Sequence, residues 1–354
     1  MARRRSKGAQ ESGSPAPGRV TINDVARLAG VSKKTVSRVI NNSPLVRAGT
    51  RAKVKAIIEK HGFEPDPQAR ALAFRKSFLI GLVYDNPSPQ YVVNMQRGIL
   101  DEIQDSSFQL VLHPCERSDP TLLKRVRSFV VQQRPYGVIL PPSVSESDEL
   151  AAILAELDCS YVRIASVKLD DNARMVRTHD ADGAAQAARH LADLGHKRIA
   201  HVHGPKSFRS AHERLAGFRR GLKDRGLALD KALTLEGGYT FDSGVECTQK
   251  LLARADRPTA IFLGNDEMAV GAYQAVRKAG LLVPDDISIV GFDDTPMASR
   301  VWPPMTTVRL PIREMGRAAA RLLMSAEAPG GDAPLIEFPA EIIIRDSSKA
   351  PRRG

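Results

Sequence analysis

Short apolar runs that alternate with helix-like segments recur twice between residues 78 and 292, and this recurrence constrains the fold more than any other feature. The runs span 78–84, 137–140 and 161–165, and then 198–203, 260–263 and 287–292. Corresponding runs lie between 119 and 128 residues apart, and helix-like segments separate them at 181–194, 209–225 and 267–279. Strand–helix alternation predicts parallel sheets covered by helices, here as two similar α/β subdomains.

Polar residues follow these runs, where the carboxyl ends of parallel strands form the edge at which ligands bind. After the first run come Tyr84, Asp85 and Asn86. The later runs are followed by Ser166, by Asn265–Asp266 and by Asp293–Asp294. We expect these groups to converge on one cleft between the two subdomains.

Positive charge is concentrated in the first 76 residues. The chain has 354 residues and a formal net charge of +12, and residues 1–76 contain 17 basic and 5 acidic residues. The remaining residues contain 35 of each kind and are neutral overall. A neutral body with a basic head is typical of a nucleic-acid binder with a second function. A basic tail kept for solubility would need no internal pattern, whereas this head has one.

The head begins with residues 1–19, an Arg-, Ser-, Gly- and Pro-rich arm that we expect to be disordered. Thr21 and Asp24 then form a capping-box pattern, and apolar residues follow at helical spacing as far as Gly30. Ser32 can cap a second helix, and a third apolar helix follows.

The joint between the first two helices allows only a tight turn, with Val31 as its buried residue. This spacing predicts a helix-turn-helix, whose second helix lies in the major groove of DNA. A solvated basic helix in an unrelated three-helix bundle is the alternative.

Residues 20–42 resemble the DNA-binding head of the LacI/GalR (lactose-repressor) family of bacterial transcription regulators. The pattern continues through residues 50–54, 63–65 and 69–72, and the resemblance covers nearly the whole chain after the arm. Three positions depart from the family pattern. Arg47 stands where a Ser or Thr cap is usual, Gly49 weakens the first turn of the third helix, and Asp66 replaces Asn. We expect a less stable head and a shifted phosphate contact, with the function unchanged.

The resemblance implies which head residues contact DNA. Base edges are read by Lys33, Lys34 and Arg38, and because Lys and Arg donate to guanine O6 and N7, G-rich half-sites are expected. The phosphates are positioned by Thr21, Ser32, Thr35, Ser37 and Asn41.

The resemblance also implies a hinge helix, which forms in the minor groove when it pairs with the hinge of a second protomer. The hinge contacts are Ala69, Arg70 and Leu72. Leu72 falls at the position that wedges a central base step, although packing within a linker is the alternative.

For the body, the resemblance implies a periplasmic-binding-protein-like fold of two parallel-sheet α/β subdomains. We expect the chain to cross between them near 178–180, to return around 303–308, and to cross again near 338–344. The expected divisions are the arm 1–19, a helix-turn-helix domain 20–64, a hinge helix and linker 65–76, an N-terminal effector subdomain 77–178 plus 309–338, a C-terminal effector subdomain 179–308 plus 339–346, and a flexible tail 347–354.

Three segments match effector-site motifs of the family: 213–218 with Arg214, 265–269 with Asn265, and 291–294 with Asp293. Tyr239 stands where the family often has an aromatic ring. Paired donors and acceptors suit the vicinal hydroxyls of a mono- or oligosaccharide, which is the expected effector, and a purine is the alternative. The candidate contacts are Tyr84, Asp85, Asn86, Ser166, Arg214, Tyr239, Asn265 and Asp293. For each acid, a loop cap or surface ion pair is the alternative.

Other classes of protein fit the sequence poorly. No apolar run is long enough to span a membrane, and the basic start has no apolar segment of a secretory signal. Three scattered cysteines form no disulfide framework, so we expect a cytoplasmic protein that joins the nucleoid when bound to DNA. The histidines around His201 and His203 lack zinc-ligand spacing, and phosphate-loop and nucleophile-elbow motifs are absent. We therefore expect neither an enzyme nor a bound metal or cofactor. A secreted sugar-binding protein would share the body but not the head.

The resemblance implies a repressor that clamps a pseudo-palindromic operator as a dimer. An effector in the cleft would rotate the N-terminal subdomains, separate the hinges and release the DNA. Corepression by a purine or another metabolite is the alternative. Because no Leu-rich heptad follows the body, we expect a homodimer rather than a tetramer.

Overall fold

The computed structural model describes residues 20–40, 45–63, 77–325 and 334–352. The chain forms two compact units, a head within Met1–Arg75 and a body within Lys76–Gly354. Asn41 and the hinge positions Ala69, Arg70 and Leu72 lie outside the described residues, so their expected DNA contacts stay predictions.

The head contains the three expected helices, α1 (Ile22–Ala29), α2 (Lys33–Ile40) and α3 (Ala48–His61). Helix α1 begins at the predicted capping box, in which Asp24 N donates to Thr21 Oγ1 at 3.4 Å and Thr21 N donates to Asp24 Oδ2 at 3.1 Å. It ends at Gly30, whose φ of 66° is left-handed and favours glycine. Helix α2 follows after the tight turn, and Ser32 Oγ accepts a hydrogen bond from Thr35 N at 3.1 Å.

A small apolar core holds these helices together, and Val31 packs against it, partly buried, as expected. The side chain of Arg47 makes no cap bond to α3, in line with the departure noted at this position. The fully or nearly buried core residues are Val25, Ala26, Ala29, Val36, Val39, Val46, Val54 and Phe63.

The body contains two six-stranded sheets, which confirms the predicted two-subdomain α/β fold. The first sheet has the order β11-β5-β4-β3-β1-β2, and its pairs are all parallel. The second has the order β12-β10-β9-β8-β6-β7 and is parallel except for the pair β10–β12. The strands are β1 (Leu79–Tyr84), β2 (Gln109–Pro114), β3 (Gly137–Leu140), β4 (Ser160–Ala165), β5 (Met175–Thr178), β6 (Ile199–His203), β7 (Thr234–Glu236), β8 (Ala260–Leu263), β9 (Ser288–Asp293), β10 (Thr306–Arg309), β11 (Ile336–Phe338) and β12 (Glu341–Ile343).

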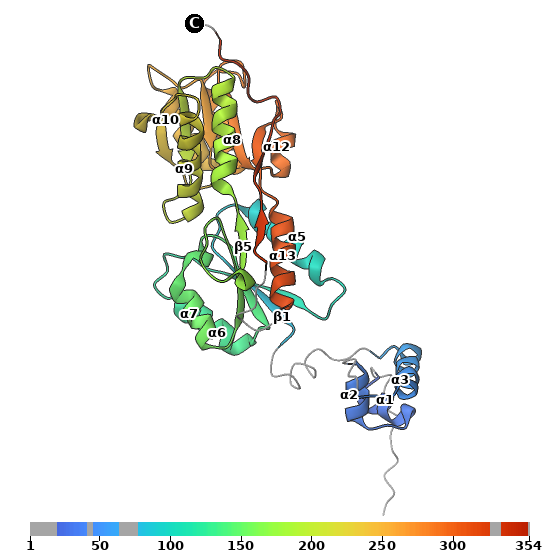
Figure 1. Ribbon diagram of the computed structural model, residues 1–354. Coiled ribbons are helices and arrows are strands. Elements are labelled where there is room, and N and C mark those ends of the chain that lie inside the picture. Colours follow the sequence, from blue (N-terminus) through green and yellow to red (C-terminus); the bar gives the residue numbers. More distant parts are fainter. Residues whose placement is uncertain (1–19, 41–44, 64–76, 326–333, 353–354) are drawn as a thin grey trace, which may run out of the picture. The chain divides into compact units, whose positions relative to one another are not determined.

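Helices cover both sheets, as strand–helix alternation requires. Figure 1 shows α5, α6, α7 and α13 in one subdomain and α8, α9, α10 and α12 in the other. Their bounds, with that of α11, are α5 (Pro89–Ile103), α6 (Leu122–Gln133), α7 (Asp148–Glu156), α8 (Asp180–Asp193), α9 (Arg209–Lys223), α10 (Phe241–Leu252), α11 (Asp266–Lys278), α12 (Pro296–Arg300) and α13 (Ile312–Met324). Short 3₁₀ turns lie at Val144–Glu146, Asn172–Arg174 and Lys231–Leu233.

The chain crosses between the subdomains three times. It passes from β5 to α8 at 178–180, from β10 to α13 at 310–311, and from β11 to β12 at 339–340. The return expected around 303–308 therefore lies later, because β10 still pairs with β9 in the second sheet. Its sequence, Thr-Thr-Val-Arg, is too short and polar to be recognised as a buried strand.

Residues 347–352, expected to lie in a flexible tail, are packed against the second sheet. Ser347 is fully buried, donates to the carbonyl of Ile289 at 2.5 Å and accepts from Thr306 N at 2.8 Å. Short hydroxyl side chains can satisfy buried backbone groups in this way, which a polar composition alone does not reveal.

Helix α9 lies close against α8 because glycine is present at the contact. A Cβ at Gly217 would lie 2.0 Å from the carbonyl oxygen of Ala181. This approach fixes the position of Arg214, which lies three residues earlier on α9.

No helix among the described residues is long and apolar enough to cross a membrane.

Candidate effector cavity and DNA interface

A cavity lies between the two subdomains of the body, where strands of both sheets end. Hydrogen bonds across the cleft, from the backbone N–H of Arg209 to Glu146 and from Arg117 to the carbonyl of Ser207, hold the two subdomains together beside it. The residues that line it are Asn86, Ser88, Tyr91, Pro142, Thr178, Asp180, Phe208, Ser210, Arg214, Tyr239, Asn265, Asp293, Leu310 and Met315.

Arg214 is buried in this cavity and is surrounded by groups that compensate its charge. Its Nε lies 2.8 Å from Asp180 Oδ2, and its Nη2 lies 3.7 Å from Asp293 Oδ1. Its Nη1 donates to the carbonyl of Gly264, and its guanidinium carbon lies 3.7 Å from the ring centroid of Phe292. A buried cation needs such partners, so Arg214 supports the fold as well as facing the cavity.

Asp293 ends β9 with a φ of 111° and is also buried. Burial raises the pKa of its carboxyl well above the ordinary value, although Arg214 opposes the shift. Among the described residues, Asp293 Oδ1 and Tyr91 Oη are buried atoms without a hydrogen-bond partner, and both residues line the cavity. Unsatisfied buried polar atoms are costly, so both are available to a ligand.

Asn265 and Tyr239 line the cavity as well, but each also has a structural role. Asn265 caps α11 by accepting from Met268 N at 3.0 Å, and its Nδ2 donates to the carbonyl of Tyr239 at 3.0 Å. An amide nitrogen carries two N–H groups, so one donor remains. Tyr239 has a φ of 59° and packs edge-on against Phe208 at 5.3 Å between ring centroids.

The structure does not bring three of the expected contacts to this cavity. The Tyr84 side chain packs against the core of the first subdomain, and Asp85 Oδ2 accepts a hydrogen bond from Arg117 N at 2.8 Å. Ser166 is buried but is not a lining residue. Of Tyr84, which ends β1, and the two residues that follow it, only Asn86 lines the cavity.

Asp180 is the most important cavity residue that the sequence analysis missed. It accepts hydrogen bonds from Thr178 Oγ1 at 2.5 Å and from Arg214 Nε at 2.8 Å. It lies where β5 ends and α8 begins, and β5 was not recognised because Met-Val-Arg-Thr is short and of mixed polarity. The expected crossing at 178–180 was the available signal, since a crossing segment must border the cleft.

Asp266 lies behind the cavity and holds the C-terminal subdomain together. It accepts from Thr295 N and Thr307 Oγ1, both at 2.6 Å. Burial raises the pKa of this carboxyl to about 7, although the two hydrogen bonds oppose the shift. Asp266 therefore has a structural role next to Asn265.

A carboxylate also closes the two subdomains across the cleft. Glu146, from the first subdomain, accepts hydrogen bonds from the backbone N–H of Arg209 at 3.0 and 3.1 Å, at the start of α9. Arg117 bridges the same gap, since its Nη1 lies 3.2 Å from Glu146 Oε2 and donates to the carbonyl of Ser207 at 2.7 Å. Burial raises the pKa of Glu146, although these hydrogen bonds oppose the shift.

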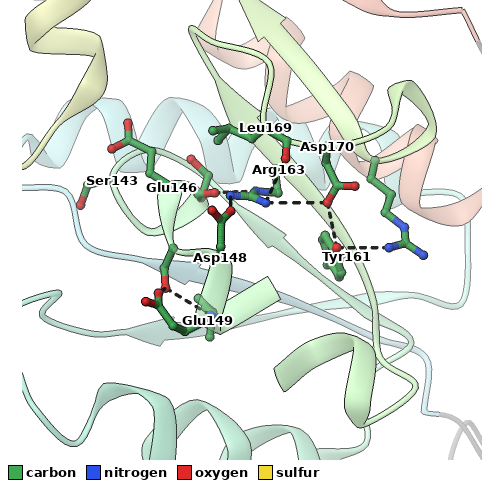
Figure 2. A network of polar contacts seen from close by, with 12 residues as sticks. Ser143, Glu146, Asp148, Glu149, Tyr161, Arg163, Leu169 and Asp170 are labelled. Atoms are coloured by element: carbon green, nitrogen blue, oxygen red, sulfur yellow. Dashed lines mark hydrogen bonds and ion pairs between the residues drawn. The ribbon is translucent and has the colours of Figure 1, made fainter. Parts of the chain in front are cut away.

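The loop that carries Glu146 is held by Arg163, a buried residue of β4. Figure 2 shows its guanidinium beside Asp148 and Asp170, with nitrogen–oxygen distances of 2.9 and 3.8 Å. Its Nε also donates to the carbonyl of Ser145 at 2.6 Å, so Glu146 is positioned from within its own subdomain.

In the head, Lys33 and Lys34 are exposed at the start of α2, and Arg38 is half-buried one turn later. The hydroxyls of Thr21, Ser32 and Thr35 already take part in the helix caps. Ser37, on α2, is half-buried. Phosphate contacts by Thr21, Ser32 and Thr35 would therefore replace these capping hydrogen bonds or be made in addition to them.

The fold and these sites define a class of protein, in which a helix-turn-helix head accompanies a two-subdomain body of ligand-binding architecture. A family model described as bacterial regulatory proteins, lacI family, matches residues 21–66, and a model of a periplasmic binding protein-like domain matches residues 188–348. Among the described residues, no group of three His, Cys, Asp or Glu side chains could hold a metal ion.

Known proteins of full length are similar to this chain. Catabolite control protein A of Priestia megaterium is 34% identical over 334 residues, 93% of this chain and 99% of that protein. The structure of a transcriptional regulator CelR–cellobiose complex is 32% identical with a TM-score of 0.70, covering 93% of this chain and 100% of that chain. The lac repressor dimer bound to operator and the anti-inducer ONPF is 30% identical with a TM-score of 0.76, covering 94% and 100%.

The chain therefore belongs to the LacI family of bacterial regulatory proteins. It is a DNA-binding transcriptional regulator and, like the other regulators of this family, not an enzyme.

Proposed function

We propose that this regulator is a homodimeric repressor that leaves its operator when a carbohydrate binds between the two subdomains of the body. The observation that carries the proposal is the cavity around Arg214, whose lining includes Asp293 Oδ1 and Tyr91 Oη, two buried oxygens without a hydrogen-bond partner. Carboxylate, phenol and amide groups together offer the mixed acceptors and donors that sugar hydroxyls require.

The aromatic lining also supports a sugar. Tyr239 and Phe208 present an apolar, edge-to-face pair beside Arg214. Sugars combine hydroxyls at the ring edge with an apolar ring face, and a cavity of this composition suits both. The similar CelR regulator was solved in complex with cellobiose, which favours a carbohydrate as the ligand of the present chain.

The closed cleft supports regulation by opening and closing. The hydrogen bonds between Glu146 and the backbone N–H of Arg209 join the two subdomains across the cleft, so we expect them to open when a sugar enters or leaves. A ligand that prefers one arrangement of the subdomains shifts the population toward it, and the attached hinges would move with the first subdomain.

The base-reading role of Lys33, Lys34 and Arg38 belongs to the same proposal. Their place on α2 fits insertion of this helix in the major groove, and the phosphate contacts of Thr21, Ser32, Thr35 and Ser37 would fix its orientation.

The proposal is tested by selecting operator sequences from random duplexes with the purified full-length protein. The selected duplex is then titrated with protein in the presence of ribose, glucose, galactose, cellobiose or adenine, at fixed salt. We expect a pseudo-palindromic site and release by one of the sugars. Tighter DNA binding with adenine and no response to any sugar would instead show a corepressed, purine-responsive regulator.

A further inference from the structure

We propose that the effector site selects neutral polyhydroxyl ligands and rejects acidic sugars and sugar phosphates, because this chain's own carboxylates already occupy both positive features of the cleft. The inference rests on the proposed function and specifies the chemical class of its ligand.

The first positive feature is the guanidinium of Arg214. Among the described residues that line the cavity, it is the one cation, and Asp180 holds it at 2.8 Å through a side chain that is itself only 2% exposed. The remaining faces of the guanidinium are taken by the carbonyl of Gly264 and the ring of Phe292. An anionic ligand would therefore have to displace Asp180 from Arg214 or bind Arg214 while Asp180 is still paired with it.

The second positive feature is the N-terminus of α9, a fifteen-residue helix whose first N–H groups would attract an anion in an open cleft. Here the carboxylate of Glu146 accepts both hydrogen bonds from the backbone N–H of Arg209. Glu146 also pairs with Arg117 at 3.2 Å, so the same carboxylate faces this nearby cation. The helix end that could bind a phosphate group is closed by a built-in carboxylate.

The charge of the cluster disfavours an anion in either protonation state of Asp293. With Asp293 ionised, two carboxylates face one guanidinium and the cluster is negative. With Asp293 protonated, Asp180 and Arg214 cancel each other. Neither state presents a net positive charge, and a charge in a low-dielectric site is costly without a counter-charge.

The unpartnered atoms indicate what a suitable ligand offers. Asp293 Oδ1 can accept a hydrogen bond, and Tyr91 Oη can donate and accept. Neutral hydroxyls satisfy both atoms without adding charge. The lining thus fits a ligand with adjacent uncharged hydroxyls and excludes carboxylate or phosphate at the same place.

The test compares each neutral sugar with an acidic derivative that keeps its rings, by titration calorimetry on the full-length protein at pH 7.5. The pairs are glucose with glucuronate, galactose with galacturonate, cellobiose with cellobiouronate, and ribose with ribose 5-phosphate. In any pair that binds, we expect the neutral member to bind at least about tenfold more tightly, the effect of one uncompensated charge near a carboxylate. Asp180→Asn, which frees Arg214, should reduce this ratio, and Glu146→Gln is the second variant if Asp180→Asn does not fold.

Asp182→Asn is the matched control. Asp182 lies two residues after Asp180 on α8, is exposed, and pairs with Arg220 at 2.5 Å. Its ratio should equal that of the wild type. Equal or tighter binding of an acidic member by the wild type would overturn the charge selection and leave the sugar effector intact. Binding of no sugar, neutral or acidic, by protein that still binds its operator would overturn the carbohydrate effector itself.

Discussion

Asp293 and Asp294 are adjacent carboxylates in opposite environments. Asp293 lines the cavity with an unpartnered oxygen, whereas Asp294 pairs with Arg309 at 2.8 Å and Arg345 at 2.6 Å. We therefore assign Asp293 to ligand binding and Asp294 to the stability of the fold.

Asp293→Asn should weaken effector binding by about 0.5–1.5 kcal/mol, because a carboxyl oxygen that can accept from the effector is replaced by an amide N–H group that cannot. The melting temperature should not fall, since burying a carboxylate is itself unfavourable. Asp294→Asn is the control, and it should lower the melting temperature while leaving effector affinity unchanged. Calorimetric titration and thermal unfolding of both variants measure the two effects, and equal effector affinities for the two variants would refute the assignment.

Asp266 makes the stability of the body depend on pH. Its folded-state pKa of about 7 lies above the ordinary value of 3.8, so the folded protein keeps a proton that the unfolded chain releases in this range. The stability that this proton contributes is complete below pH 3.8 and is lost as pH rises through about 7. Asp266→Asn removes the titration but keeps an acceptor oxygen for Thr307.

Between about pH 4 and 7, the wild type should lose stability relative to Asp266→Asn, by up to about 1.4 kcal/mol per pH unit. Urea unfolding of both proteins at pH 5, 6, 7 and 8 measures this difference. Parallel pH profiles would show that the carboxyl of Asp266 does not titrate in this range.

Site residues predicted from a matched family motif all line the cavity, whereas of those predicted from strand ends alone only Asn86 does. Arg214, Asn265 and Asp293 line the cavity, and each was placed by a motif of the family. Tyr84, Asp85 and Ser166 were chosen only because they follow strands, and they lie elsewhere. A strand end limits a residue to one edge of a sheet, but the direction of its side chain depends on the turn that follows. Asp180 was missed for the complementary reason, because its strand was not recognised.

At the level of elements, uniformly apolar strands were predicted well, and short strands of mixed composition poorly. The six apolar runs correspond to β1, β3, β4, β6, β8 and β9, whose interiors are buried on both faces. Strands β5, β10, β11 and β12 have three or four residues each and lie near the crossings, so neither length nor hydrophobicity distinguishes them from loops. The edge strand β2 is largely exposed, which gives it a mixed composition.

Helix α2 carries the prediction for DNA recognition. Lys33→Ala and Arg38→Ala should each weaken binding to the selected operator by about 1–3 kcal/mol, with a smaller loss on random DNA. The reason is that a contact to a base edge is lost only at the matching site, whereas a phosphate contact is lost on every duplex. Fluorescence anisotropy at one fixed salt concentration measures both affinities.

Lys223→Ala, at an exposed position on α9 in the body, is the control and should change neither affinity. If Lys33→Ala weakened operator and random DNA equally, Lys33 would contact phosphate rather than a base.

For the whole molecule, an exposed tryptophan supports assembly through the body. Trp302 is 86% exposed and follows α12, on which Met297 is also exposed. Tryptophan is enriched at the centres of protein interfaces, and so large an exposed indole is unusual for a free surface.

We expect a homodimer at micromolar concentration and a shift toward monomer in Trp302→Asp. Val131→Asp, at an exposed apolar position on α6, is the control and should remain dimeric. Light scattering on the three proteins distinguishes these states. A stable tetramer, or a Trp302→Asp variant as dimeric as the wild type, would contradict the prediction.

The central claim is that the cavity and the DNA-binding head are coupled through one conformational equilibrium. Such a coupling is reciprocal, so an effector that weakens operator binding must itself bind more weakly to the operator complex, by the same factor. The most direct measurement is therefore a closed cycle of four affinities: operator with and without the releasing sugar, and sugar with and without operator. We expect both ratios to agree at about 5–150-fold, the usual range of allosteric coupling. An operator affinity that is unchanged by a sugar bound at the cavity would contradict the account.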